Sequence, residues 1–205
     1  FTDPFSPTNP RDFLSKRERR LIKEASLEYE SVPSWFSLNS EQRDEWKTYL
    51  AQRLRKPKNQ ITKEDFNVGG YKVPSLVYVS MDTGLRPIEI ERSHLGWIDL
   101  HNQILRIPAN ESSKNTEYWT PAFTDRTRDL LEAWLEERRL DEKYDGSDTI
   151  WLTQYGNPYT TQSLRQTLHK LCEIAGISLE GRSMSWYTIR HSLGSAMAES
   201  SSLST

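Results

Sequence analysis

The sequence predicts a mostly helical α+β fold with a small three-stranded antiparallel sheet in its middle. Two observations carry this prediction. Apolar residues recur at intervals of three and four over several long stretches, which is the period of an amphipathic helix. Between residues 97 and 123 the pattern changes to short runs rich in Ile, Leu and Trp, separated by polar residues, which is typical of strands. The sequence contains no internal repeat and no low-complexity tract.

The first part of the chain predicts a linker followed by three helices. Residues 1–12, FTDPFSPTNPRD, are rich in Pro and polar residues and resemble a linker. Ser15 with Glu18 forms the pattern of a capping box and predicts the start of the first helix. We expect Ser40 to cap a second helix that runs to residue 54, and Thr62 to cap a short third one.

A buried helix and a turn come next. The segment YKVPSLVYVSMDTG is apolar on most sides and should form a buried helix that Gly84 ends. Pro87 suits the first position of the following helix, so Arg86 falls in the turn, because a residue before proline is disfavoured in the α conformation. Glu89 then lies in the first turn of the new helix, where it could brace Arg86.

The sheet and two further helices follow. We expect two strand-like runs joined through residues 99–103, and the run TEYWTPAF as the third strand. Helices return over residues 124–140 and 163–177, the second of them ended by Gly176.

The stretch SMSWYTIRHSLGSAMAE, residues 183–199, predicts the final helix. At about 100° per residue, Arg190 lies at the border of the apolar arc, with Tyr187 and His191 beside it. A half-buried arginine needs a carboxylate or phosphate to accept hydrogen bonds from its five N–H donors. The alternative is a structural arginine with a tyrosine partner. The arc itself is formed by Trp186, Ile189, Leu193, Ala196 and Met197.

Two further features suggest anion binding. Arg86 lies beside a helix start, whose backbone N–H groups attract anions, although a surface Arg86–Glu89 pair is the ordinary alternative. The run NESSKNTEYWTPAF places Lys114 in a polar loop between two strand-like runs. A lysine there could protonate a leaving oxygen, but lysines at loop tips are common.

Composition limits the class of protein. The chain has 205 residues, with 27 Lys and Arg against 29 Asp and Glu, and its net charge of −2 argues neither for nor against nucleic acid. Basic clusters, such as residues 53–58, are offset by an acidic one at Glu132, Glu136 and Glu137. The lone Cys172 allows no internal disulfide, and no Cys/His cluster has metal-ligand spacing. Since no apolar run approaches the roughly 20 residues that span a bilayer, we expect a soluble, cytoplasmic protein without a metal or cofactor.

In this order, three motifs resemble those of the tyrosine recombinases, or phage-type integrases. TGLRPIE is similar to the first arginine box, SSKN to the catalytic-lysine hairpin, and YTIRH to the second box, usually written His-x-x-Arg-His. The resemblance runs from about residue 11 to the end. Three segments are similar in sequence to integrase-like proteins of halophilic archaea in particular: KVPSLVYVSMDTGLRPIEI, ESSKNTEYW and RSMSWYTIRHS. This similarity suggests a mobile element.

The resemblance implies a catalytic domain over residues 13–205 that acts on double-stranded DNA. It implies DNA strand cleavage and rejoining through a 3′-phosphotyrosyl intermediate, performed by a tetramer on DNA. Residues 1–12 would then be the tail of an N-terminal core-binding domain. The implied catalytic residues are Arg86, Lys114, Tyr187, Arg190 and His191, supported by Glu89, and the DNA contacts are those of Arg86, Lys114 and Arg190.

Two departures from the family pattern matter. Tyr187 stands where the family has its first histidine, and a phenol carries no positive charge near neutral pH. The nucleophilic tyrosine of the third box would lie beyond Thr205, so we expect none in this chain and no cleavage by this chain alone. Two alternatives stay open: an inactive DNA-binding remnant or regulator, and a helical interaction module whose arginines form separate internal salt bridges.

Overall fold

The computed structural model of the protein describes residues 13–112 and 118–193. Most of this part is helical, as the sequence predicts. The α-helices are α1 (Lys16–Ser26), α2 (Ser40–Leu54), α3 (Lys72–Thr83), α4 (Pro87–Glu91), α5 (Asp125–Arg139) and α6 (Thr161–Ile174), and residues 186–193 are helical too. Short 3-10 helices are η1 (Trp35–Ser37), η2 (Lys58–Gln60), η3 (Lys63–Asn67), η4 (Leu95–Trp97) and η5 (Glu142–Tyr144).

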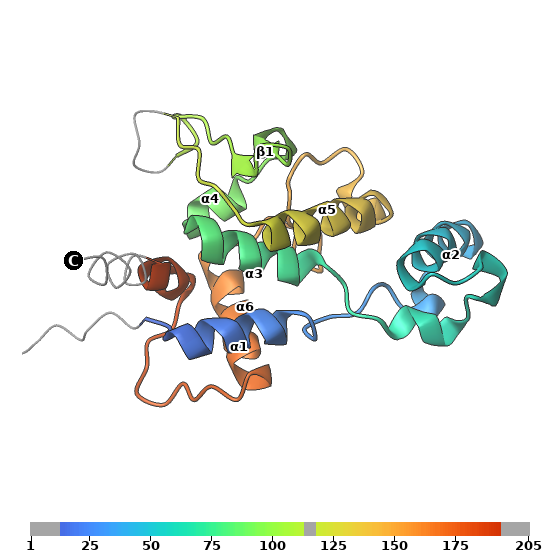
Figure 1. The fold of residues 1–205 in the computed structure, drawn as a ribbon, viewed down its shortest axis with the longest axis horizontal. Coiled ribbons are helices and arrows are strands. Elements are labelled where there is room, and N and C mark those ends of the chain that lie inside the picture. Colours follow the sequence, from blue (N-terminus) through green and yellow to red (C-terminus); the bar gives the residue numbers. More distant parts are fainter. Residues whose placement is uncertain (1–12, 113–117, 194–205) are drawn as a thin grey trace, which may run out of the picture.

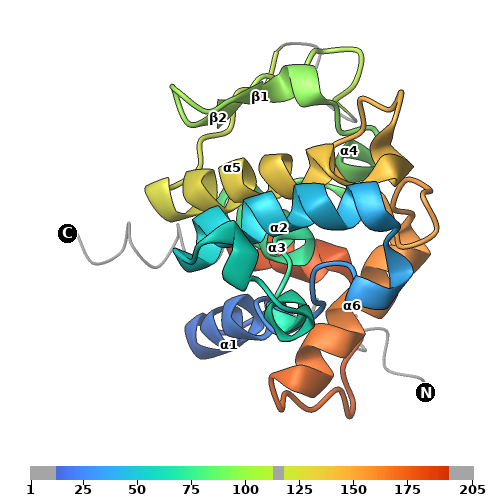
Figure 2. The same ribbon diagram turned by 90° about the vertical axis from the view of Figure 1, so that its right-hand side faces the viewer.

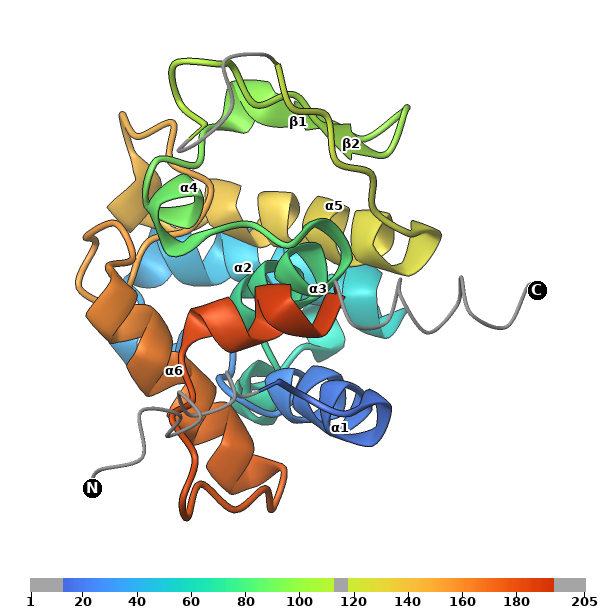
Figure 3. The ribbon, with the colours of Figure 1, turned by 90° about the vertical axis from the view of Figure 1, so that its left-hand side faces the viewer.

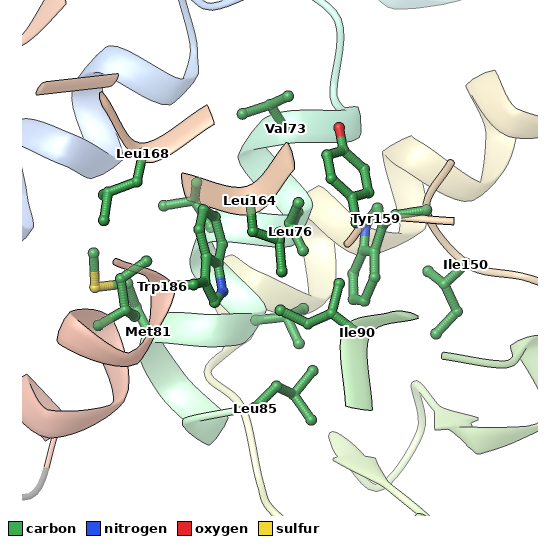
Figure 4. Close-up of a cluster of buried hydrophobic side chains, with 14 of the residues drawn as sticks. Val73, Leu76, Met81, Leu85, Ile90, Ile150, Tyr159, Leu164, Leu168 and Trp186 are labelled. Carbon is green, nitrogen blue, oxygen red and sulfur yellow. The ribbon is translucent and has the colours of Figure 1, made fainter. Parts of the chain in front are cut away.

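Helix α3 is the centre of the fold. Figure 1 shows it between α5 on one side and α1 on the other, with α6 crossing behind. Ten of its twelve residues are buried, which agrees with the prediction of a helix that is apolar on most sides. Leu76 of α3 lies in one core with Leu164, Leu168 and Trp186 (Figure 4). This core fixes the position of every helix that contributes to the site described below.

Local signals place most helix boundaries where the sequence predicts them. Ser15 and Glu18 form the expected capping box, and Gly84 ends α3 with a φ of 66°. Thr62 starts η3, whose Asp65 carboxylate accepts a hydrogen bond from the Thr62 N–H. One prediction is wrong: the N-cap of α2 is Asn39 rather than Ser40. Asn39 Oδ1 accepts from the Gln42 N–H, and the Asn39 N–H donates to Gln42 Oε1.

The sheet has two strands rather than the predicted three. Strands β1 (Ile98–Asp99) and β2 (Ile104–Leu105) form the expected antiparallel hairpin. The run after residue 117 is joined to β2 and to the residues just beyond it by isolated bridges, Ile104 with Ala122 and Ile107 with Trp119. Proline explains the difference: Leu105 donates to the carbonyl of Pro121, but Pro121 has no N–H to return the bond, so the ladder is interrupted.

Residues 31–69, called the α2 lobe below, form a second small core. Figure 1 shows the lobe at one end of the molecule, joined to the rest by two chain segments, and Figure 2 shows it from the front. A bridge between Ser31 and Gly69 closes its base. The buried residues of the lobe are Val32, Trp46, Leu50, Ile61 and Phe66. The sequence did not predict this separation.

Glu137 joins the α2 lobe to α5. The residue is 3% exposed, although it belongs to an acidic cluster in the sequence. It accepts hydrogen bonds from the Tyr49 hydroxyl at 2.8 Å, from Arg53 at 3.1 Å and from the Tyr71 N–H at 2.7 Å. Burial raises the pKa of Glu137 to about 7, although all three donors oppose this shift.

Candidate functional site

Arg86 lies in the turn between α3 and α4. Gly84 ends α3 in the left-handed conformation, and Pro87 starts α4 three residues later. Arg86 between them is extended, with φ −79° and ψ 155°, as expected for a residue before proline. Its side chain is 14% exposed, so its charge lies just beneath the surface.

Glu89 fixes the conformation of Arg86. The Glu89 carboxylate is fully buried and accepts two hydrogen bonds from Arg86, one from the backbone N–H and one from Nη1, both at 2.8 Å. The contact predicted from the sequence is therefore present. Since an unpaired buried carboxylate is costly, this ion pair holds the guanidinium group in one place. Among the described residues, the side chain of Arg86 donates through Nη1 alone, which leaves its other terminal nitrogen available to a ligand.

Arg190 reaches the same turn from the 186–193 helix. Trp186, on the apolar arc of this helix, is buried against the core, and its indole N–H donates to Ser80 Oγ of α3 at 3.2 Å. Figure 3 shows the helix (red) crossing in front of α3, with α4 nearby. From here Arg190 Nη1 donates to the carbonyl oxygen of Gly84 at 2.5 Å. The two arginines thus converge on one turn from distant parts of the chain.

The tight approach of Arg190 depends on glycine at position 84. A Cβ atom there would lie 3.1 Å from Leu193 Cδ2 and 3.6 Å from Arg190 Cγ. The positive φ also disfavours any side chain. Gly84 therefore ends α3, accepts from Arg190 and leaves room for the 186–193 helix.

The two cations act on one another. Burial lowers the pKa of Arg190, and the positive charge of Arg86 lowers it further, while Glu89 and Tyr187 oppose the shift. Within the described part of the chain, no carboxylate forms an ion pair with Arg190. This geometry differs from that of an interaction module, which would place the arginines apart, each with its own carboxylate. In the described residues, the two guanidinium groups together have one carboxylate partner, that of Glu89, and this favours the binding of an anion.

The other predicted site residues differ in how far the structure places them. Tyr187 is 41% exposed and close enough to Arg190 to act on its charge. His191 lies one residue beyond Arg190 and is half-buried. Lys114 falls in residues 113–117, outside the described residues. Ala196 and Met197 of the predicted apolar arc fall in residues 194–205, which are outside them too.

The structure adds two groups that the sequence did not single out. One is the carbonyl oxygen of Gly84, which sequence reasoning treated only as a helix end. The other is Trp119, whose ring centroid lies 5.8 Å from the guanidinium carbon of Arg190. The quoted run around Lys114 contains Trp119, but nothing in the pattern points to its contact with Arg190.

Neither a metal site nor a membrane span is found in the described ranges. Among residues 13–112 and 118–193, no group of three or more His, Cys, Asp and Glu side chains is arranged to hold a metal ion. In the same ranges no helix has the length and apolar character needed to cross a bilayer.

The fold is similar to those of two recombinases of known structure. The crystal structure of XerA recombinase matches with a TM-score of 0.60 and 15% sequence identity, over 96% of this chain and 52% of its own. The XerH site-specific recombinase, bound to its difH substrate in a pre-cleavage complex, matches with a TM-score of 0.52 and 18% identity, over 83% and 44%. The chain thus spans about half the length of these proteins. Identities this low show a likeness of fold.

The family is shown by the sequence itself. No curated protein matches the chain. Residues 59–204, however, match the profile described as the phage integrase family, and this range includes both arginines and the 186–193 helix. The chain belongs to the phage integrase family.

Proposed function

We propose that the protein takes part in site-specific DNA recombination, by cleaving and rejoining DNA strands through a 3′-phosphotyrosyl intermediate. The observation that carries the proposal is the meeting of Arg86 and Arg190 at Gly84, where the pair has a single carboxylate. Membership of the phage integrase family and the likeness of fold to XerA and XerH recombinases support it.

The arginine pair suits the electrostatics of this reaction. A tyrosine oxygen attacks phosphorus, the 3′-phosphotyrosyl bond forms and the 5′-oxygen leaves. Negative charge grows on the non-bridging oxygens in the transition state, where preorganised guanidinium groups stabilise it most. Each such contact is typically worth roughly 10²- to 10³-fold in rate. Glu89, buried beneath Arg86, keeps that group in position before DNA arrives.

Three more residues take roles in the proposal. Lys114 protonates the leaving 5′-oxygen, and Tyr187 and His191 orient the phosphate or the arginines. Tyr187 hydrogen-bonds as a neutral phenol where a histidine could also bring charge. No tyrosine follows Tyr187 in these 205 residues, and the proposal assigns the role of nucleophile to none of them. By analogy with the family, four copies assemble on DNA.

Duplex DNA binding tests the first step. We expect weak binding whose affinity falls as salt rises, because phosphate contacts dominate it. Arg190→Ala should weaken binding and reduce the slope of log K against log salt by about one. Arg139→Ala is the control, since Arg139 lies in the last turn of α5 and is 68% exposed. An affinity that does not respond to salt would contradict a phosphate site.

Strand cleavage distinguishes the enzyme from an inactive DNA-binding relative. In a longer form of the protein that includes the nucleophile, Arg86→Ala or Arg190→Ala should abolish cleavage of a suitable duplex. An inactive relative would bind DNA without covalent attachment in any form. Cleavage at the normal rate by either variant would show that the boxes are misassigned.

A further inference from the structure

The backbone of Trp119 is fixed by the hairpin. Its N–H donates to the carbonyl of Ile107, and its carbonyl accepts from the N–H of Ile107, at 3.0 and 2.9 Å. The ring is half-buried and packs against the main core. Because both backbone groups of Trp119 are hydrogen-bonded to Ile107, its ring can fix the position of a side chain that contacts it.

The partner of this ring is Arg190. The guanidinium carbon lies 5.8 Å from the ring centroid, within the range of a cation–π contact, for which tryptophan is the best aromatic partner. Within the described ranges, the guanidinium group of Arg190 also donates a hydrogen bond to the carbonyl of Gly84, which uses one of its five N–H groups. Both partners are uncharged.

An indole and a carbonyl leave Arg190 able to bind an anion. A carboxylate in the same place would neutralise the charge and occupy two donors in a bidentate pair. The indole face attracts the cation but accepts none of its in-plane hydrogen bonds. The arginine is therefore oriented while most of its donors stay available.

We propose that Trp119 is a positioning residue for Arg190, which holds the guanidinium group over Gly84 in the orientation that receives a DNA phosphate. The inference rests on the proposed function, because it assumes that Arg190 binds phosphate. Trp119 also lies five residues after Lys114. The ring thus joins the segment that begins at residue 118 to Arg190.

A double-mutant cycle on DNA affinity tests the inference. Trp119→Leu keeps apolar volume without an aromatic face, and Trp119→Phe keeps a face. Each is measured in the wild-type and the Arg190→Ala background, with a short random-sequence DNA duplex at two salt concentrations. Tyr118→Leu is the matched control, because Tyr118 precedes Trp119 in an extended run and is 74% exposed. Thermal unfolding of each variant shows that it is folded.

We expect Trp119→Leu to weaken binding by roughly two- to thirty-fold in the wild-type background and not at all in Arg190→Ala. Trp119→Phe should retain most of the affinity, and Tyr118→Leu all of it. A role in packing alone would weaken binding as much in the Arg190→Ala background as in the wild-type one.

Two results would overturn the inference while leaving the phosphate site intact. One is wild-type affinity in Trp119→Leu when Arg190→Ala is weakened. The other is an equal loss from Trp119→Leu in both backgrounds, which would mean that the ring acts independently of Arg190. Wild-type affinity in Arg190→Ala itself would instead overturn the proposed function, and the inference with it.

Discussion

The guanidinium group of Arg190 donates a hydrogen bond to the carbonyl oxygen of Gly84, the residue that ends α3 two positions before Arg86. One backbone oxygen thus joins the two arginine boxes of the chain. Because the acceptor is uncharged, the contact positions Arg190 without neutralising it. Of the two arginines, Arg86 alone forms an ion pair with a carboxylate within residues 13–112 and 118–193, and that carboxylate, of Glu89, is fully buried.

Gly84→Ala should destabilise the protein more than the same change at Gly176. Both glycines have a φ of 66°, which costs alanine about 1–2 kcal/mol. A Cβ at 84 also meets Leu193 at 3.1 Å, whereas one at 176 meets nothing within 4 Å. Denaturant unfolding of both variants measures the difference, and DNA affinity should fall only for Gly84→Ala. Equal losses of stability would show that the helix is not held against this turn.

Glu89→Gln should lower the free energy of unfolding by roughly 1–3 kcal/mol, because it removes the charge from the fully buried carboxylate that pairs with Arg86. The control is Glu91→Gln on the same helix, where we expect a change within about 0.5 kcal/mol. Urea denaturation provides the measurement. If the two variants were equally stable, Glu89 would not be what fixes Arg86.

Glu137 should make stability depend on pH. Its pKa is about 7 in the folded protein against 4.5 as the ordinary value, so the folded state holds this proton more tightly. Stability from this group is therefore full below about pH 4.5 and is lost as the pH rises to about 7, by roughly 3 kcal/mol at most.

Glu137→Gln isolates this contribution. Gln stays uncharged at every pH, so the variant should lack this loss. The difference in unfolding free energy between the two proteins should thus change between pH 4.5 and 7. The neighbouring groups Tyr49, Arg53, Glu30 and Lys72 are present in both proteins. A difference that is constant with pH would mean that folding does not raise the pKa of Glu137.

Elements set by neighbours in sequence could be predicted, and contacts between distant segments could not. The capping box at Ser15, the end of α3 at Gly84 and the start of α4 at Pro87 all depend on residues a few positions apart. Pro121 also carries a local signal, since proline interrupts a ladder, and this signal argues against a third strand.

The burial of Glu137 had no such signal. Its donors Tyr49 and Arg53 lie more than 80 residues earlier, and its neighbours Glu132 and Glu136 suggest a solvated face. The groups of the candidate site also fall into those that the sequence predicts and those that it does not. Arg86, Glu89 and Arg190 follow from motif and helix period, whereas the Gly84 carbonyl and the Trp119 ring enter only through the fold.

On the proposed function, Arg86 and Arg190 bind one phosphate together. The structure of the protein bound to duplex DNA tests it most directly, through the distances from both guanidinium groups to the nearest phosphate oxygens. We predict that both lie within hydrogen-bond distance of the same phosphate, with Arg190 still donating to Gly84. Contacts of the two arginines to different phosphates, or to none, would contradict the account.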